Sequence, residues 1–303
     1  MQEMEKYLIL LSLVSACLVN AAPAVNQTFY NYAYALDLSG AVPYNTFSCI
    51  KSNGYSAVFI RAYDPSGVGM FDANAVNNIR SAYQAGLGTE VFMTPLLRSM
   101  KRGSEQFREL YEGLKYGNIQ LRTVWIQVTS PVNWGPNTPE NINFLNDIIM
   151  AANSYGIAVG IYTSAYDWDQ ITKGANVGNA MLWYWNVYGA GPSGETPANF
   201  DDFRPFGSFY RPTVKQFAQK ESVCGIVVNR DAYTMNTMKY GNKLLQKTEG
   251  KIVVGLLGNT MGFVQSYKKR SYINGANNKS NEMYNFLCAG LDLSKEGNKH
   301  FSG

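Results

Sequence analysis

Histidine is almost absent from this 303-residue chain, since its single copy, His300, lies near the C-terminus. A Ser-His or Cys-His triad is therefore not expected, because its imidazole must stand beside the nucleophile. The four cysteines show no paired spacing, so a zinc site is not expected either. The sequence has no P-loop, and no dinucleotide-binding glycine loop follows the first expected strand. We therefore expect no metal and no other cofactor.

Charged residues are also scarce, at 16% of the chain, and lysine and arginine are scattered along it. The one basic run, 268–270, is expected to be a solvated turn, so we expect no nucleic-acid partner. Hydrophobic residues make up 46% and aromatic residues 14%, which is enough for one large core and excludes disorder for most of the chain. The net charge of +4 suits contact with anionic surfaces such as bacterial walls.

One apolar stretch stands out, from Tyr7 to Val19. It follows Lys6 and leads to Ala21, so that Val19 and Ala21 occupy the −3 and −1 positions of a cleavage site. The stretch is too short to span a bilayer as a helix, and no later apolar run is long enough to do so. We therefore predict a cleaved signal peptide over residues 1–21 and a secreted, extracellular protein.

Secretion makes the cysteines and the sequons informative. One of the four cysteines leaves with the signal peptide, so the mature chain carries Cys49, Cys224 and Cys288. An oxidising compartment then favours one disulfide and one free thiol. Asn26 and Asn278 each begin an Asn-X-Ser/Thr sequon near an end of the chain, so both are predicted N-glycosylation sites.

Eight short runs rich in Val, Ile, Tyr and Trp predict strands, and the first five alternate with helical periods. Residues 189–212 have no helical period, and only a turn fits between 217 and 225. This pattern predicts an α/β fold, an irregular TIM-barrel-like (β/α) barrel of about five β–α units followed by three strands with few helices. A doubly wound sheet is the alternative. The predicted strands are Ala33–Leu38, Ala57–Tyr63, Thr89–Thr94, Thr123–Val128, Ala158–Thr163, Leu182–Val187, Thr213–Phe217 and Gly225–Asn229.

Three helices are predicted from the helical spacing of their apolar residues and from residues typical of helix ends. One ends at Gly86, and a second lies between a capping Ser104 and Gly117. The third is capped by Thr138 and ends at Gly156.

The chain is expected to divide into a barrel domain over residues 22–233 and a separate C-terminal extension over residues 234–303. Most of the extension is polar and rich in Gly, Asn and Lys, so we expect it to be partly disordered. Within it, Val253–Leu257 fits a strand or a buried turn.

Several linked motifs occur in order along the predicted barrel. Together they resemble the family 25 glycoside hydrolases, which are lysozymes, and in particular the nematode-type lysozyme-like branch. The resemblance covers about 34–233, nearly the whole barrel, and it is the order and spacing of the motifs that make it specific. The motifs are Tyr34–Ser39, Phe47–Cys49, Ile60–Tyr63, Gly160–Ser164, Leu182–Tyr184 and Cys224–Ile226.

The resemblance implies a cleft at the C-terminal ends of the strands that cuts the β-1,4 bond after N-acetylmuramic acid. It also implies an Asp-x-Glu pair at the end of the fourth strand, where residues two apart share a face. Gln127 and Thr129 stand at those positions, and Asn229 stands at the acidic position of the eighth strand. Asp37 alone survives of the four implied carboxylates, since Asp231 falls past the expected end of its strand.

These replacements predict a loss of hydrolysis. Glycoside cleavage needs a protonated acid and a second, negative carboxylate, which neither an amide nor a hydroxyl supplies. A slip in the alignment does not restore the pair, because no Asp or Glu occurs from Lys115 to Pro139. Asp167 and Asp169 are expected to cap a short helix rather than act as replacement acids.

We therefore predict a catalytically impaired protein that binds bacterial wall glycan or chitooligosaccharide, and the resemblance implies a role in innate defence. An active muramidase with relocated carboxylates is the first alternative, and a structural or signalling ectoprotein is the second. The sequence indicates no oligomeric state. The predicted substrate-binding residues are aromatic side chains near strand ends, where rings stack on sugar faces. They are Tyr63, Tyr162, Trp183 and Tyr184, with Trp183 and Tyr184 on opposite faces of their strand.

A closed barrel carries two further expectations. Its first and eighth strands are neighbours, so Cys49 and Cys224 are expected to form the disulfide and leave Cys288 free. Asp37 is expected to face only neutral amide and hydroxyl groups at the cleft, and therefore to have an ordinary or lowered pKa.

Overall fold

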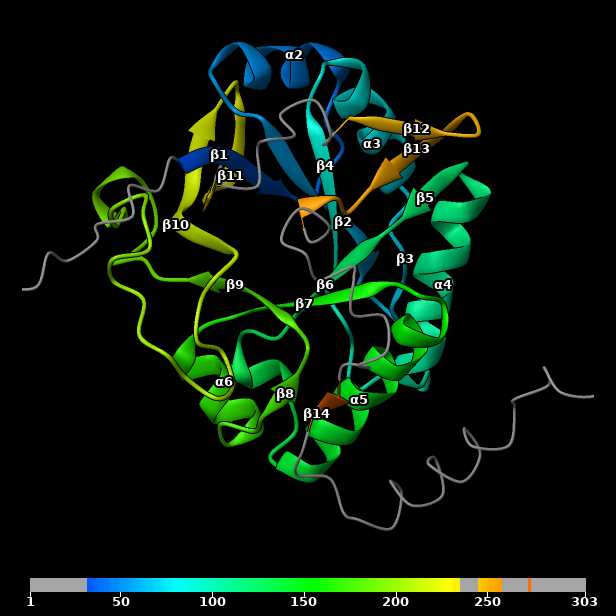
Figure 1. Cartoon of the computed structure of the whole chain (residues 1–303), viewed down its shortest axis with the longest axis vertical. Coiled ribbons are helices and arrows are strands. Elements are labelled where there is room, and N and C mark those ends of the chain that lie inside the picture. Colours follow the sequence, from blue (N-terminus) through cyan, green and yellow to red (C-terminus); the bar gives the residue numbers. More distant parts are fainter. Residues whose placement is uncertain (1–31, 235–244, 258–271, 274–303) are drawn as a thin grey trace, which may run out of the picture. The chain divides into compact units, whose positions relative to one another are not determined.

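The computed structural model describes residues 32–234, 245–257 and 272–273. Eight strands close into a barrel in the order β1-β11-β10-β9-β7-β6-β4-β2, because β2 pairs back onto β1 (Figure 1). The (β/α)-barrel class expected from the sequence is confirmed, and all eight expected runs form strands. The barrel strands are β1 (Tyr32–Leu38), β2 (Ala57–Asp64), β4 (Gly88–Met93), β6 (Thr123–Gln127), β7 (Ala158–Thr163), β9 (Met181–Trp185), β10 (Val214–Val223) and β11 (Ile226–Thr234).

One α-helix follows each of the first five barrel strands, as the alternating pattern predicts. Between β9 and β10, all of which the structure describes, the chain forms only a short 3-10 helix, η2 (Pro192–Gly194). The α-helices are α2 (Tyr44–Ser52), α3 (Ala75–Gln84), α4 (Gly103–Tyr116), α5 (Thr138–Ser154) and α6 (Ala165–Thr172). The short elements between them are β3 (Met70–Phe71), β5 (Ile119–Leu121), η1 (Pro131–Asn133) and β8 (Val177–Gly178).

Two helix starts differ by a residue or two from the expected caps. Thr138 is already helical, and Asn137 precedes it as the cap. Helix α4 begins at Gly103, and the Glu105 carboxylate accepts a hydrogen bond from the Arg102 backbone N–H at 2.7 Å. Ser104 is therefore inside the first turn rather than before it.

The last two barrel strands differ most from the expectation. Strand β10 continues to Val223 instead of ending near residue 217, and β11 runs antiparallel to both β10 and β1. The link between them is the two-residue turn Cys224–Gly225, with φ of 52° and 79°. A turn this short cannot cross a barrel, so the strands it joins must be antiparallel. Strand β11 then continues to Thr234, which places Asp231 inside the strand.

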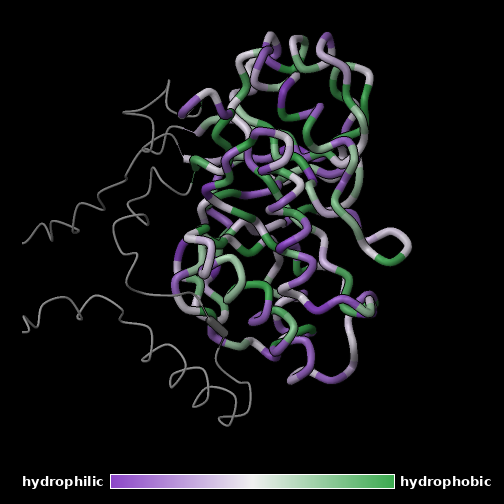
Figure 2. Tube along the Cα trace, turned by 90° about the vertical axis from the view of Figure 1, so that its right-hand side faces the viewer, coloured by the Kyte–Doolittle hydropathy of each residue, from purple (hydrophilic) through white to green (hydrophobic). Residues whose placement is uncertain are grey.

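Side chains alternate between two buried layers, one inside the barrel and one between the barrel and its helices. Hydrophobic and hydrophilic residues are interspersed along the trace (Figure 2). The interior layer combines alanines of β1 with large rings from the facing strands, among them Trp125 and Trp183. Gly160 makes room for Trp125, because a Cβ at this glycine would lie 2.1 Å from the indole Cε3.

The described part of the C-terminal extension packs against the N-terminal ends of the barrel strands. It forms a hairpin of β12 (Gln246–Thr248) and β13 (Lys251–Val254), and β13 pairs in parallel with β5. Leu256 and Leu257 then join the interior layer. The expectation of a separate extension is therefore wrong for these residues, which complete the barrel core. Farther on, β14 (Tyr272–Ile273) pairs with β8.

A buried carboxylate holds this segment in place. Glu90 of β4 accepts hydrogen bonds from the Leu257 N–H at 2.8 Å and from the Trp125 indole N–H at 2.9 Å. Burial raises the pKa of Glu90 to about 7, although both donors act to lower it. Gly255 precedes the contact with φ +81°, and a Cβ there would lie 2.4 Å from the Thr123 nitrogen. The close approach of the segment to β6 thus requires glycine.

Candidate functional site

A cavity opens at the C-terminal ends of the parallel strands, where the family resemblance implies a cleft. Its volume of about 410 Å³ is within the range of small-molecule sites. The ends of five strands and the β10–β11 hairpin surround it, and we call it the mouth cavity. Its lining residues are Asp37, Leu38, Ser39, Arg61, Phe92, Thr94, Gln127, Tyr162, Lys220, Val227, Val228 and Asn229.

Among the residues that the structure describes, Asp37 is the one acidic residue that lines the mouth cavity. The register of β1 on β11 places it opposite Asn229, whose Nδ2 donates to Asp37 Oδ1 at 2.9 Å. Gln216 Nε2 donates to the other oxygen at 2.6 Å. Asn229, at the implied acidic position, is therefore a hydrogen-bond donor to the surviving acid. Gln216 was not predicted as a site residue. The available signal was its position two residues after Val214, which faces the barrel interior, because residues two apart in a strand share a face.

A second carboxyl group lies on the same face of β11, two residues beyond Asn229. Asp231 is fully buried, and its Oδ1 accepts a hydrogen bond from the Trp183 indole N–H at 2.8 Å. Its Oδ2 has no hydrogen-bond partner among the residues the structure describes. Asp231 does not line the mouth cavity, so it faces the barrel interior beneath the opening.

Burial dominates the electrostatics of this pair. It raises the pKa of Asp37 to about 6, against the lowering effect of the Asn229 and Gln216 amides. It also raises the pKa of Asp231 well above the ordinary range, and the charge of Asp37 adds to this. The expectation of an ordinary or lowered pKa for Asp37 is therefore wrong, because it considered neutral neighbours and left out burial and Asp231. Of the two carboxyl groups, Asp37 is the one that ionises more readily, because it accepts two hydrogen bonds and borders the cavity.

The variant Asp231→Asn should lose less stability than the wild type as the pH rises. Because the folded-state pKa of Asp231 is raised, its contribution to stability is complete below the unfolded value of about 3.8 and is lost as the pH rises through the folded value. Asparagine keeps an oxygen for Trp183 and cannot ionise. Urea unfolding at pH 4.5 and pH 8 measures the difference, and equal losses in the two proteins would contradict a buried titrating carboxyl here.

The implied Asp-x-Glu positions hold a neutral hydrogen-bonded pair. Gln127 Nε2 donates to Thr129 Oγ1 at 3.0 Å, and the Thr94 hydroxyl donates to Gln127 Oε1 at 2.6 Å. Gln127 lines the mouth cavity, whereas Thr129 lies just outside its lining. The pair can donate and accept hydrogen bonds, but it offers neither an acid proton nor a negative charge near neutral pH.

Two cationic residues border the same cavity. Arg61 is paired with Asp72 at 2.8 Å and with Asp64 at 3.0 Å, so its charge is compensated on the side away from the cavity. Lys220 is exposed at the β10–β11 hairpin, and its backbone N–H donates to Asn229 Oδ1 at 3.0 Å. The mouth cavity therefore combines one acid, two cations and several neutral hydrogen-bonding groups.

Of the four predicted aromatic binding residues, Tyr162 lines the mouth cavity. Its ring stacks on Trp183 with centroids 4.0 Å apart, and Trp183 is fully buried beneath it. Phe92, which was not among the predicted binding residues, supplies a second ring at the cavity. Trp183 is thus a support for Tyr162 and Asp231 rather than a contact surface for a ligand.

Tyr63 and Tyr184 are not at the mouth cavity, and both belong to the layer between barrel and helices. Tyr184 alternates with Trp183 and therefore points outward, where its hydroxyl donates to Asp202 at 2.6 Å. For Tyr63, the pairing of β2 with β4 shifts between Arg61 and Tyr63, which turns the tyrosine to the outer face. The prediction that these two residues bind substrate is wrong for these reasons.

Asp167 has a different environment from the one expected. The side chain that caps α6 belongs to Ser164, which accepts a hydrogen bond from the Asp167 N–H at 3.1 Å. The Asp167 carboxylate is buried and accepts a hydrogen bond from the Trp185 indole N–H at 2.9 Å. It does not line the mouth cavity, and neither does Asp169. Neither residue therefore replaces a missing acid at the opening.

The expected disulfide is present and joins Cys49 of α2 to Cys224. Cys224 lies in the turn between β10 and β11, so the disulfide fastens the hairpin that carries Lys220 and Asn229 to the helix after β1. It thereby supports one side of the mouth cavity.

Several predicted features lie outside the described residues, namely the signal peptide 1–21, the sequons at Asn26 and Asn278, and Cys288. Within the part of the chain that the structure describes, no helix is long and apolar enough to cross a membrane. In the same part, no group of three or more histidine, cysteine or acidic side chains is placed to hold a metal ion.

The barrel is of the type found in family 25 lysozymes. A family GH25 lysozyme from Aspergillus fumigatus superposes with a TM-score of 0.54 at 18% identity, covering 71% of this chain and 99% of that one. The bacterial lysozyme from Streptomyces coelicolor gives 0.51 at 19% identity, covering 66% and 91%. At such identities the likeness shows the shared fold.

Sequence comparison identifies the family. The family model described as lysozyme-like protein 1 matches residues 28–217. Lysozyme-like protein 7 of Caenorhabditis elegans is 50% identical over 258 residues, covering 84% of this chain and 87% of the relative. Probable GH family 25 lysozyme 2 of Dictyostelium discoideum is 32% identical and covers 63% and 86%. The chain belongs to the lysozyme-like protein family, which confirms the resemblance found in its sequence.

Proposed function

We propose that this protein is a secreted glycan-binding member of its family that holds bacterial wall glycan or chitooligosaccharide at the mouth cavity with little or no hydrolysis. The observation that carries the proposal is the composition of that cavity. It has a ligand-sized volume, aromatic rings and many hydrogen-bonding groups, but the described residues supply it with only one carboxylate.

Binding is supported by the chemistry of the lining. The rings of Tyr162 and Phe92 offer apolar faces of the kind on which sugar rings stack. Gln127, Asn229 and Asp37 add amide and carboxylate groups that match sugar hydroxyls. Solved structures of this fold include a lysozyme and a muramidase, which favours a wall glycan as the ligand class.

Loss of hydrolysis follows from the carboxylates. An oxocarbenium-like transition state needs an acid at the leaving oxygen and a second negative group nearby. Asp37 could supply one proton, but Asp231 is fully buried and bonded to an indole, so it cannot contact a substrate as placed. No second carboxylate from the described part of the chain lines the mouth cavity to complete the pair.

The runner-up is a muramidase that works at mildly acidic pH. The observation that favours it is the raised pKa of Asp37, about 6, which keeps a proton available at the cavity below that pH. The need for a second carboxylate weighs against it. Hydrolysis that peaks below pH 6 and disappears in Asp37→Asn would support this function over the first.

Secretion and a place in innate defence complete the proposal. A disulfide between Cys49 and Cys224 suits an oxidising compartment. The predicted signal peptide and sequons point the same way. The defence role is proposed from the family resemblance.

The proposal is tested by titrating the purified protein with a soluble N-acetylglucosamine oligosaccharide. We expect binding by the wild type and an affinity about tenfold or more weaker in Asp37→Asn, since a hydrogen bond to a charged group contributes about 1.5–3 kcal/mol. Asp201→Asn, an exposed acid away from the cavity, is the matched control and should bind like the wild type. Equal affinities of wild type and Asp37→Asn, or no binding by folded wild type, would contradict the proposal.

A further inference from the structure

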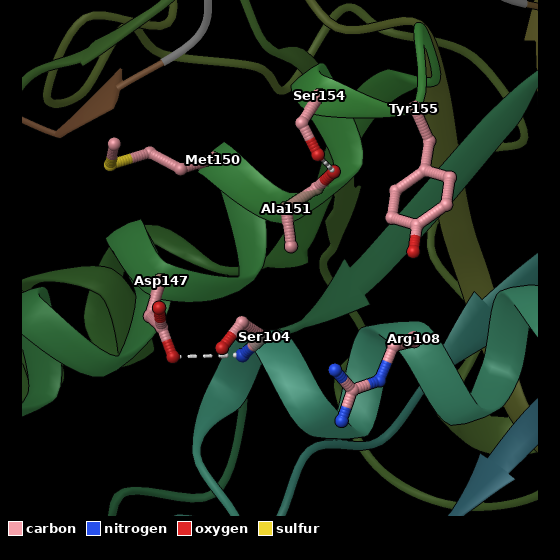
Figure 3. A pocket seen from close by; sticks show the side chains of 7 residues that line it. All are labelled: Ser104, Arg108, Asp147, Met150, Ala151, Ser154 and Tyr155. Carbon is pink, nitrogen blue, oxygen red and sulfur yellow. Dashed lines mark hydrogen bonds between the residues drawn. The ribbon is translucent and has the colours of Figure 1, made fainter. Parts of the chain in front are cut away.

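A second hollow lies between α4 and α5, on the outside of the barrel. Its volume is about 310 Å³, and it shares no lining residue with the mouth cavity. Figure 3 shows Ser104 and Arg108 extending from α4 and the other side chains from α5 and its end. We call it the α4–α5 groove, and it is lined by Ser104, Arg108, Asp147, Met150, Ala151, Ser154 and Tyr155.

One wall of the groove is a supported aromatic ring. Tyr155 is 39% exposed, and its ring packs against Tyr111, with centroids 4.4 Å apart, and against Phe107 at 5.9 Å. Phe107 is fully buried in the core. The contacts hold the tyrosine in one orientation before a ligand arrives, which lowers the entropy lost on binding. An exposed ring fixed in this way is a platform for the flat face of another ring.

Polar groups surround the ring, and several have unused bonding capacity. The Arg108 guanidinium forms no hydrogen bond or ion pair with any residue that the structure describes. Asp147 uses Oδ2 to accept the Ser104 backbone N–H at 2.8 Å, as the dashed line in Figure 3 shows. The Ser154 hydroxyl donates to the Ala151 carbonyl at 2.7 Å and can still accept a bond. Donors and acceptors thus border the same hollow as the ring.

The charge of the groove selects among ligand classes. One arginine and one aspartate cancel, so the groove has no net charge that would favour a phosphate or an acidic peptide. The hydroxyls, the arginine cation and the aspartate anion can together form hydrogen bonds with a neutral ligand that is rich in hydroxyl and amide groups. The tyrosine ring and the Met150 side chain, which is 38% exposed, suit the apolar C–H face of a sugar ring.

We propose that the α4–α5 groove is a second saccharide-binding site, which holds a glycan strand at a distance from the mouth cavity. The ligand class rests on the proposed function of the mouth cavity. Two sites on one molecule would raise its retention on a polymeric wall far more than its affinity for a short oligosaccharide, because the second contact becomes intramolecular.

The test uses the full chain and two N-acetylglucosamine ligands, insoluble chitin and a soluble oligosaccharide. We expect Tyr155→Ala to reduce retention on chitin about tenfold or more, with Arg108→Ala acting in the same direction. Tyr116→Ala and Arg98→Ala are matched controls, since both residues are exposed and lie outside the groove. With the oligosaccharide, we expect two molecules bound per wild-type chain and one in either Tyr155→Ala or Asp37→Asn.

The outcomes separate the two proposals. If Tyr155→Ala and Arg108→Ala, both folded by thermal melting, keep wild-type retention on chitin and wild-type stoichiometry, the groove is not a saccharide site, whereas the mouth proposal stands. If binding survives in Asp37→Asn unchanged but falls in both groove variants, the groove is the glycan site and the mouth proposal fails. Arg108→Ala keeps the test decisive if Tyr155→Ala does not fold.

Discussion

The double variant Gln127→Asp with Thr129→Glu should hydrolyse bacterial walls at least about 10²-fold faster than the wild type, since one positioned acid or base typically contributes 10²–10⁴-fold. Both side chains lie on one face of the β6 end, where Gln127 already donates to Thr129. The Thr94 hydroxyl, which donates to Gln127, is placed to bond a carboxylate there. Asn229 limits the gain, because it keeps an amide at the third implied acidic position. Clearing of a wall suspension measures the rate.

The neutral variant Gln127→Asn with Thr129→Gln is the matched control, because it has the same side-chain sizes without the acids. It should remain as inactive as the wild type. If it clears walls as fast as the acidic variant, the carboxylates are not what the cavity lacks. If the acidic variant folds and binds glycan but stays inactive, the site has lost more than its acids.

Removing the disulfide with Cys49→Ser and Cys224→Ser should lower the free energy of unfolding by about 3–5 kcal/mol, because the bond closes a loop with a sequence separation of 175. The loss should extend to function. The bond fastens the β10–β11 hairpin to α2, so the order of Asn229 and Lys220 at the cavity depends on it. We therefore expect weaker glycan binding as well as a lower urea midpoint.

Cys288→Ser is the control for this experiment, since the sequence predicts that Cys288 is a free thiol. It should leave both the urea midpoint and glycan binding unchanged. Non-reducing peptide mapping that joins Cys288 to either of the other cysteines would contradict the pairing. A double variant as stable as the wild type would contradict the energetic argument.

Much of the barrel was predictable because its elements depend on local pattern. Runs rich in β-branched and aromatic residues marked the strands, and Gly86, Gly117 and Gly156 marked the ends of three helices within two residues. The direction of each strand was harder to predict, because amino-acid composition does not distinguish parallel from antiparallel strands. The signal was the short Cys224–Gly225 link, which forces an antiparallel pair. The packing of Leu256 and Leu257 into the barrel could not be predicted, since it depends on contacts distant in sequence.

The site was predicted at the level of residue positions but not of environment. The resemblance located Asp37, Gln127 and Asn229, and all three line the cavity. The pKa of Asp37 could not be obtained in this way, because it depends on burial. The outward turn of Tyr63 follows from a local irregularity in strand pairing that has no pattern in a single sequence. Electrostatics and side-chain orientation therefore required the tertiary structure.

The central claim is that the mouth cavity holds a wall glycan without cutting it. Native mass spectrometry after prolonged incubation with a soluble peptidoglycan oligosaccharide tests this directly, because it reports both the complex and the length of the bound glycan. We expect a complex that carries the oligosaccharide intact and is weakened in Asp37→Asn, with no shorter fragments in solution. Fragments that accumulate in proportion to protein concentration, or the absence of any complex with folded protein, would contradict it.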